Sequence, residues 1–405
     1  MTNVKQYDFD TIHDRRNTSA IKWMMRFNHN FEMIPIKDND IPLWIADMDF
    51  PNPPEIQDGL KQRIDHGFFG YTAAPQELKA VITQRMSDLY NWNINPDWIL
   101  FNPGMVMFLG IITRVVTNPG AGILMTPPVY GPFHSLPPHH GRFAQKVPLI
   151  RVDDDAHTFH YDIDFDALEA AITQQTELFY LCSPHNPIGK AFTQAELEKL
   201  ADICLRHNIK IASDDIHSDL MLGNAQHIPI ATLSPEIAHN TITMIAGTKT
   251  FNMAGLACSA AIIPDDDLRT KVQQYSFSSG YHVDTLAYEA LLIGYRDCNE
   301  WLRQVLGYIT ENRDYVTDYI CKQLPMLKTT VPSATYLQWI DCSALKLPEK
   351  YPNPTEFFAE EAGVIFSRGN FFSPHATDYV RMNLACPRSM LVEGLDRMKA
   401  AIESL

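Results

Sequence analysis

The stretch LFYLCSPHNP at residues 178–187 places five consecutive apolar residues directly before a polar loop. A short apolar run that is bounded by Ser and Pro is typical of a buried strand. The loop then carries His185 and Asn186 just beyond the end of that strand. In open α/β sheets, ligands bind beyond the carboxyl ends of the strands, so this loop is a candidate for a binding site.

Other apolar runs along the chain end in the same way. Residues 209–217 read IKIASDDIH, residues 242–252 read ITMIAGTKTFN and residues 122–130 read GILMTPPVY, and a further run, AAII, lies at residues 260–263. Helical patterns alternate with these runs at residues 54–66, 76–91 and 193–207. The last begins with a capping box of Thr193 and Glu196 before an apolar stripe at helical spacing. The alternation predicts an α/β domain with a mostly parallel sheet.

The remainder of the chain predicts a second, smaller domain. Residues 285–324 have the pattern of one long helix, and another helix is expected at about 389–404. We therefore expect three parts: an N-terminal segment at 1–50 that packs on both domains, a large domain at 51–285 and a small domain at 286–405.

Composition narrows the class of protein. The chain has 405 residues, 45% of them hydrophobic and 20% charged, which is ordinary for a globular protein. Its formal net charge of −15 disfavours nucleic acid and anionic membranes as partners. No apolar run approaches the length of a membrane span, and residues 1–16 lack the apolar core of a signal peptide. The seven cysteines include no CxxC pair, which favours the cytoplasm over a disulfide framework or a zinc site.

Taken singly, the polar residues at the strand ends have ordinary explanations. Asn186 precedes a proline and suits a turn, while Asp214 could cap a helix. Lys249 could be a solvated surface lysine, and Tyr130 could be a core or interface aromatic residue.

Taken together and in this order, Asn186, Asp214 and Lys249 resemble the fold-type-I pyridoxal-phosphate (PLP) enzymes, the class I and II aminotransferases and their relatives. The resemblance extends over nearly the whole chain, through the motifs Trp44–Phe50, Phe69–Tyr71 and Arg381–Asn383. It implies a large domain with a mostly parallel seven-stranded sheet, a smaller α/β C-terminal domain and a homodimer with shared active sites.

Within that family, the chain is most similar to the cystathionine β-lyase-like C–S lyases. The motifs that carry this similarity are Ala46–Phe50, Ser183–Pro187, Ser213–His217, Lys249–Asn252 and Cys386–Arg388. The resemblance implies α,β-elimination from cystathionine or another S-substituted cysteine, with a thiol, pyruvate and ammonia as products. Transamination of an amino acid is the alternative, and a non-catalytic PLP-binding regulator is a second one.

The resemblance also implies a role for each residue around the cofactor ring. Lys249 would bind the cofactor aldehyde and then act as general base, since a lysine amine can do both. Asp214 would pair with the ring nitrogen, and Asn186 would donate to the phenolate oxygen. His217 would lie near the same oxygen and Tyr130 would stack on the ring, although an isolated histidine is more often structural.

For the cofactor phosphate, the candidates are Gly104, Met105 and Val106, which precede an apolar helical run and could present backbone NH groups. An ordinary loop glycine before a helix is the alternative for Gly104. Thr248 would add a hydroxyl, and Tyr71 would reach the phosphate from a neighbouring subunit. Many aminotransferases have an arginine where this chain has Ala257, and a serine where it has Ala246.

Two arginines and the histidine pairs complete the expected site. Arg381 would bind the substrate α-carboxylate, because its planar fork suits a carboxylate; the alternative is a surface arginine. We interpret Arg388 as structural. The pairs His139/His140 and His157/His160 lack companion ligands, so no metal site is expected.

Overall fold

A seven-stranded sheet forms the centre of the larger half of the molecule. The computed structural model describes residues 5–405, and in it the strands lie in the order β4-β12-β11-β10-β9-β5-β6. The sheet is mostly parallel, as predicted, and only β12 is antiparallel to its two neighbours among the strands of this sheet. The bounds are β4 (Ile99–Asn102), β5 (Gly122–Met125), β6 (Phe143–Lys146), β9 (Thr176–Cys182), β10 (Lys210–Asp214), β11 (Thr241–Ile245) and β12 (Ser259–Ile262).

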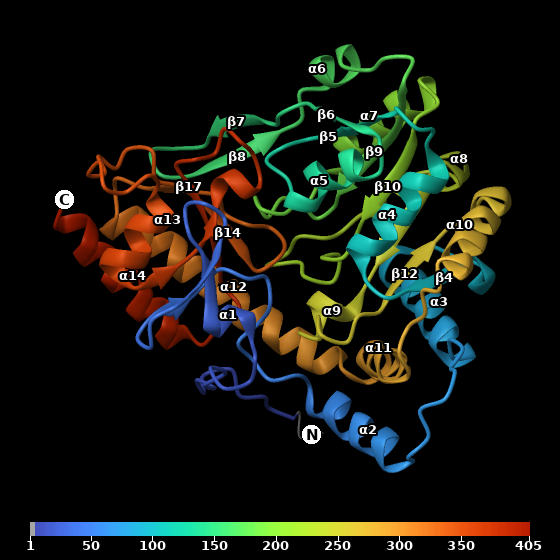
Figure 1. Cartoon of the computed structure of the whole chain (residues 1–405), viewed down its shortest axis with the longest axis horizontal. Helices are drawn as coiled ribbons and strands as arrows, with labels where there is room; N and C mark the ends of the chain where they lie inside the picture. Colours follow the sequence, from blue (N-terminus) through green and yellow to red (C-terminus); the bar gives the residue numbers. More distant parts are fainter. Residues whose placement is uncertain (1–4) are drawn as a thin grey trace.

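Helices cover both faces of this sheet (Figure 1). Side chains alternate along β9, because successive residues of a strand point to opposite faces. Phe179 and Leu181 pack in one core with α7 (Gln194–Arg206), and α6 (Phe165–Ala170) and α8 (Pro235–Asn240) lie beside α7. Tyr180 and Cys182 pack in the opposite core with α4 (Met105–Val116), which adjoins α5 (Gly131–His139) and α10 (Asp266–Ser278).

A third group of helices consists of α2 (Pro54–Asp65), α3 (Gln76–Tyr90) and α11 (Thr285–Asp297), in which α11 packs against both others. In Figure 1, α2 and α11 lie in the lower part of the molecule and α3 lies toward the right. The prediction of one helix over residues 285–324 was wrong. The chain leaves helical geometry at Cys298, and α12 (Asn299–Gln323) follows as a separate helix. Asp297, Cys298 and Asn299 all have low helix propensity, which explains the break at this point. None of the helices in the described part is long and apolar enough to cross a membrane.

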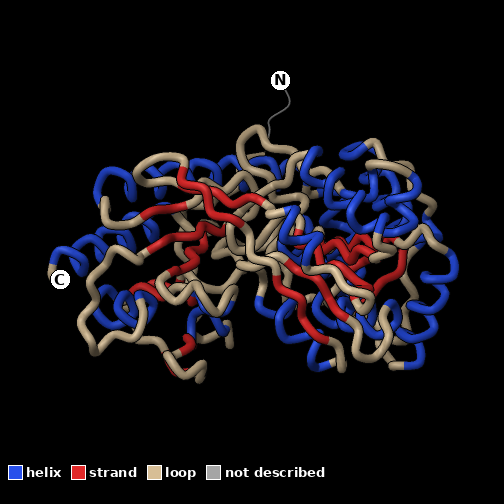
Figure 2. Tube along the Cα trace, turned by 90° about the horizontal axis from the view of Figure 1, so that it is seen from above, coloured by secondary structure: helices blue, strands red, loops and turns tan. Residues whose placement is uncertain are grey.

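The C-terminal part contains a second, antiparallel sheet in the order β13-β14-β17-β16. Figure 2 shows these strands as a group separate from the large sheet, with loops between the two groups. The bounds are β13 (Lys328–Thr329), β14 (Leu337–Asp341), β16 (Ser367–Arg368) and β17 (Tyr379–Asn383), with α13 (Pro354–Phe357), a π-helical turn at Phe358–Ala362, β15 (Val364–Ile365) and the final helix α14 (Arg388–Glu403) around them. The domain boundaries at residues 50 and 285 stay predictions.

Smaller elements complete the chain. The N-terminal segment forms α1 (Ile21–Met24) and the hairpin of β1 (Met25–Phe27) and β2 (Met33–Pro35), and its strand β3 (Ile41–Pro42) pairs with β15. A second hairpin, β7 (Ile150–Asp153) with β8 (Phe159–Asp162), follows the edge strand β6. The short helix α9 (Gly247–Thr250) follows β11, and 3₁₀ turns lie at Pro96–Trp98, Ile230–Thr232 and Gly369–Phe371.

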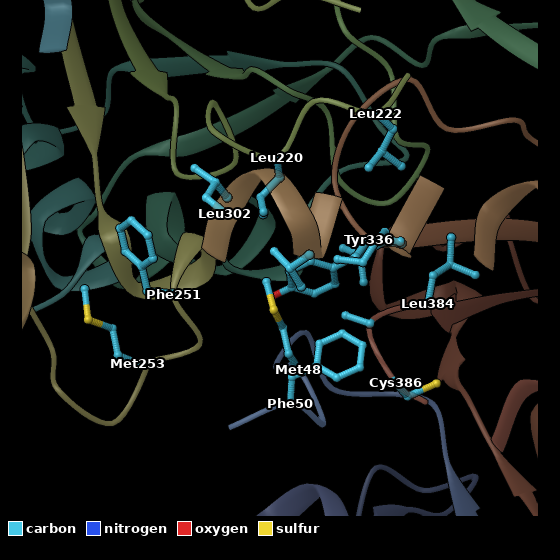
Figure 3. Packing of buried hydrophobic residues seen from close by; sticks show 14 of the residues in the cluster. Met48, Phe50, Leu220, Leu222, Phe251, Met253, Leu302, Tyr336, Leu384 and Cys386 are labelled. Atoms are coloured by element: carbon cyan, nitrogen blue, oxygen red, sulfur yellow. The ribbon is translucent and has the colours of Figure 1, made fainter. Parts of the chain in front are cut away.

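The end of the N-terminal segment is buried between the other parts. Figure 3 shows Met48 and Phe50 packed close to Tyr336, which immediately precedes β14. The same core cluster contains Phe251, next to α9, and Leu302 of α12. The stretch from residue 44 to residue 50 therefore joins the large sheet, the long helix and the small sheet through one core.

Buried charged side chains also hold the stretch from residue 44 to residue 50 in place. The Lys22 ammonium is buried and lies 2.7 Å from Asp49, whose carboxylate also accepts hydrogen bonds from the Trp23 indole at 2.7 Å and from Arg15 at 3.1 Å. Lys22 donates to the Asp47 backbone carbonyl as well, at 3.0 Å. Removing one partner of such a pair leaves the other charge buried without full compensation.

We therefore predict that Lys22→Met lowers the free energy of unfolding by about 3–5 kcal/mol. Lys61→Met is the matched control, because it removes an exposed Lys61–Asp58 pair and should cost ~1 kcal/mol or less. Urea denaturation of both variants measures the difference. Equal losses in the two variants would show that the buried pair contributes no more than a surface pair.

Candidate active site

A cavity of about 490 Å³ opens at the carboxyl ends of the large-sheet strands, and residues of the N-terminal segment and the small sheet close it from the other side. Most of the residues predicted from the sequence line this cavity. They are Met105, Val106, Tyr130, Asn186, Asp214, His217, Lys249 and Arg381. The topology explains the gathering, since β5, β9, β10 and β11 are neighbouring parallel strands whose carboxyl ends share one edge.

Lys249 lies in α9, directly after β11, and its Nζ donates a 2.6 Å hydrogen bond to the Ala46 carbonyl oxygen. Since it lines the cavity, the alternative of a solvated surface lysine was wrong. Burial lowers the pKa of its amine to about 8; Asp47 and Asp214 oppose this shift, and the Arg381 charge adds to it. An amine with this pKa is partly uncharged at neutral pH, as a nucleophile or general base requires.

Asp214 is the last residue of β10 and faces the same cavity. Burial raises the pKa of its carboxyl to about 7, and the neighbouring Asp215 charge adds to the shift. Its hydrogen bond from the Ile216 NH is long, at 3.3 Å, and the residues directly after it form a turn instead of a helix, so the helix-cap alternative was wrong. Asp215 points elsewhere, toward Ser213 and His227. A cationic group in the cavity would stabilise the charged form of Asp214.

Arg381 and Asn186 are joined directly. One Arg381 nitrogen donates to the Asn186 side-chain oxygen at 2.9 Å, and the other donates to the Trp44 carbonyl and the Ser367 hydroxyl at 2.8 and 2.9 Å. Arg381 is buried, so the surface-arginine alternative was wrong. Because the Asn186 oxygen is occupied, its amide NH₂ is left to donate to a ligand.

His217 and Tyr130 form part of the cavity wall. Burial, together with the Lys249 and Arg381 charges, lowers the pKa of His217 to about 3, so its ring is neutral and its Nδ1 has no partner among the described residues. Burial raises the pKa of Tyr130. The ring of Tyr336 lies 6.2 Å from that of His217, and its hydroxyl donates to the Ala46 carbonyl at 3.0 Å.

A second cavity of about 660 Å³ adjoins the first, and Lys249, Met105, Val106 and Tyr130 line both. Gly104 precedes the first residue of α4 with φ +113°, a conformation that glycine adopts readily and other residues avoid. The first-turn NH groups of α4 have no intrahelical partner and suit an anion. Thr248 also lines this cavity, as do Ala246 and Ala257 where many aminotransferases have Ser and Arg.

Tyr71 and Arg388 lie outside both cavities. Tyr71 is fully exposed in the loop after α2, so its predicted contact with the phosphate requires a second copy of the chain. Arg388 donates to the Asn312 side-chain oxygen at 2.6 Å and lies over the ring of Tyr315, where it fixes the start of α14. Among the described residues, no three or more His, Cys, Asp or Glu side chains are grouped so that they could hold a metal ion. This holds also for the surroundings of the pairs His139/His140 and His157/His160.

Sequence reasoning missed several groups in this site. The backbone carbonyls of Ala46 and Trp44 accept hydrogen bonds from Lys249 and Arg381, respectively. The Ser367 hydroxyl also accepts from Arg381, and the Tyr336 hydroxyl donates to the Ala46 carbonyl. Backbone acceptors leave no mark in a sequence, although both carbonyls belong to a run that matched the family. Tyr336 follows no strand end and had no signal of its own.

Comparison with known proteins agrees with this geometry. The family model for aminotransferase class I and II matches residues 39–398. The chain belongs to this family. It is 36% identical to cystathionine beta-lyase PatB of Bacillus subtilis over 98% of this chain and all of that protein, and 28% identical to protein MalY of Escherichia coli over 98% and 100%. The crystal structure of cystalysin from Treponema denticola, which contains pyridoxal 5′-phosphate, superimposes with a TM-score of 0.91 at 34% identity, over 99% of this chain and all of that one.

The residues around the two cavities fit pyridoxal phosphate. Within residues 5–405, the Asp214 carboxylate has no cationic partner at hydrogen-bond distance. It is therefore available to a protonated ring nitrogen of the cofactor. His217 and Arg381 each have a buried nitrogen with no partner in the same part of the chain. Lys249 lines both cavities. The second cavity, at the N-terminus of α4, suits the phosphate, and the first cavity contains Arg381.

We predict that the Lys249 amine of the cofactor-free protein titrates near pH 8, because burial outweighs its carboxylate neighbours. Asp214→Asn removes a negative charge that raises this pKa, so it should lower the midpoint. Arg381→Met removes a positive charge that lowers it, so it should raise the midpoint. Amine acetylation at a series of pH values, followed by peptide mass spectrometry, gives all three midpoints. Shifts in the same direction for both variants would refute the electrostatic account.

Proposed function

We propose that this chain is a PLP-dependent C–S β-lyase that cleaves cystathionine or a related S-substituted cysteine to a thiol, pyruvate and ammonia. One observation carries the proposal: Lys249, Asp214 and Arg381 line a single cavity in a chain that matches a cystathionine beta-lyase over its whole length. A non-catalytic regulator has no need of all three groups in one place.

Each residue then has a task. PLP, when bound, supplies the aldehyde that takes up the substrate amine and the ring that accepts electrons from the broken Cα–H bond. Arg381 binds the substrate α-carboxylate and fixes the orientation of Cα. The Lys249 amine removes the Cα proton, which its lowered pKa permits near neutral pH. Asp214 would pair with the ring nitrogen of the bound cofactor and so keep a positive charge on the ring, and Asn186 and His217 would lie near its phenolate oxygen.

Elimination and transamination share these residues and diverge after the Cα proton is lost. Expulsion of a thiolate from Cβ needs no second substrate, whereas transamination stops after one half-reaction unless an oxo acid is present. The similarity to a transaminase of Streptococcus mutans, at 26% identity, keeps transamination as the alternative.

The PLP-loaded enzyme, given L-cystathionine as its only substrate, should release many equivalents of pyruvate and of thiol per site, in equal amounts. Lys249→Ala should fold, as judged by circular dichroism, and release neither. Turnover that appears only when an oxo acid is added, with no thiol from any S-substituted cysteine, would establish the aminotransferase reaction instead. No turnover of either kind by the loaded enzyme would favour the regulator.

We also propose that the active unit is a homodimer in the cytoplasm. Tyr71 stands in a loop with Phe68 and Phe69, and all three side chains are exposed, as are Phe277 and Tyr281. Phe68, Phe69 and Tyr71 stand close together in the sequence of one loop, and adjoining exposed aromatic side chains of this kind are typical of an interaction surface. All seven cysteines are free, and most are buried, which fits a reducing compartment.

Mixing two inactive chains tests the shared site. In a hybrid of Lys249→Ala with Tyr71→Ala, one site carries both changes and the other site is intact. Random mixing of equal amounts should therefore restore about a quarter of the wild-type activity, as two-fold symmetry requires. Each variant alone gives the baseline. Hybrids that form, as shown by differently tagged chains, and yet remain at the baseline would contradict a Tyr71 donated across the dimer.

A further inference from the structure

Arg368, at the end of β16, has no role in the catalytic steps assigned above. Its side chain is 8% exposed and lines the same cavity as Lys249 and Arg381. One of its nitrogens donates to the Asn28 carbonyl at 2.6 Å, and its guanidinium lies 4.3 Å from the centre of the Phe31 ring. Its Nε has no hydrogen-bond partner among the described residues.

Arg368 is a buried cation without an ion-pair partner in the described part of the chain. The charge of Glu356 acts on it without a salt bridge between them. One oxygen of Glu356 is bound by Arg26 at 2.9 Å, and the other has no hydrogen-bond partner among the described residues. Burial lowers the pKa of Arg368, which is the result of this incomplete compensation. Charged side chains are rarely buried unless they are paired, so an unpaired guanidinium in a cavity wall indicates an anionic ligand.

The side chains of Arg381 and Arg368 contact different parts of the cavity wall. Ser367 lies opposite Arg381 in the β16–β17 pairing and accepts its hydrogen bond. The next residue, Arg368, points to the other face of the strand, as alternation requires, and contacts the β1–β2 loop at Asn28 and Phe31. Phe27 and Met33, which flank this loop, are apolar residues of the cavity lining, and Phe31 and Phe371 also line it.

We propose that Arg368 binds a carboxylate at the far end of the substrate's S-substituent, so that the enzyme prefers thioethers whose leaving thiol carries an anion on a short apolar chain. This inference rests on the proposed C–S lyase activity. Arg381 takes the α-carboxylate at one wall, Lys249 acts at Cα, and the apolar wall accommodates the methylene groups beyond the sulfur. Cystathionine has such a distal carboxylate, which stands beside an ammonium group.

A matched pair of substrates tests the charge alone. S-(2-carboxyethyl)-L-cysteine and S-(2-carbamoylethyl)-L-cysteine have nearly the same shape, and only the first has a distal anion. With the PLP-loaded wild-type enzyme, we expect kcat/KM to be about tenfold or more higher for the acid, as a charge-assisted bond predicts. The difference should lie mainly in KM, because the contact is made in the bound substrate as well as in the transition state.

Arg368→Gln should lower kcat/KM for the acid by about 10- to 100-fold and leave the amide within about twofold of wild type. Arg368→Lys should restore part of the discrimination, since it keeps the charge and loses the fork. Arg303→Gln is the control for a change of net charge, because Arg303 lies on the exposed face of α12 and pairs with Glu300; it should alter neither substrate.

The outcomes separate the two proposals. If the wild-type enzyme eliminates a thiol from neither compound nor from any other S-substituted cysteine, the proposed function fails. If it cleaves both compounds with equal kcat/KM, or if Arg368→Gln slows both equally, the lyase activity stands and the role of Arg368 is overturned. Turnover of the amide by Arg368→Gln shows that the variant is folded.

Discussion

The carbonyl oxygen of Ala46 is the point on which the arrangement of the site depends. It accepts hydrogen bonds from the Lys249 amine at 2.6 Å and from the Tyr336 hydroxyl at 3.0 Å. Two asparagines hold the backbone around this carbonyl by hydrogen bonds. Asn252 bonds to the backbone NH and carbonyl of Met48, and Asn383 donates to the carbonyls of residues 45 and 47. One backbone stretch thus fixes Lys249, in the helix that follows a strand of the large sheet, relative to the strand of the small sheet that carries Arg381.

This explains why motifs that lie far apart in the sequence belong together. Lys249 and Asn252 occur in one motif and Arg381 and Asn383 in another, and in each the cationic side chain enters the cavity while the asparagine binds the N-terminal segment. Burial is the largest cause of the pKa shift of each of three groups in the cavity. It lowers the pKa of Lys249 and of His217 and raises that of Asp214, so that the uncharged form of each is favoured. An amine and a carboxyl group whose pKa values are both shifted toward neutral pH are typical of a functional site, where a ligand with groups of both charges can stabilise their charged forms.

The sequence predicted the elements that carry strong local patterns. The five strands that were expected in the large sheet lie within about two residues of their predicted places, whereas β4 and β6 were not expected. Most of the predicted site residues gather in one cavity because parallel strands end at one edge. It failed at Cys298, where weak propensity ends a helix although the apolar period continues. The carbonyl acceptors, Tyr336 and Arg368 were missed because their roles arise from tertiary contacts, and Tyr71 stays a prediction because its proposed contact lies on another chain.

The charge distribution of the molecule shows why its overall composition says little about its ligands. The chain carries a formal net charge of −15, yet its cavity holds Lys249, Arg368 and Arg381 with Asp214 as an acidic side chain in the lining. Surface charges are screened over about 10 Å in salt, whereas charges inside a cavity of low dielectric interact strongly with whatever enters. An acidic surface and a cationic cavity are therefore compatible. The first disfavours contact with nucleic acids and anionic membranes, and the second suits the substrates with a carboxylate at each end that we propose.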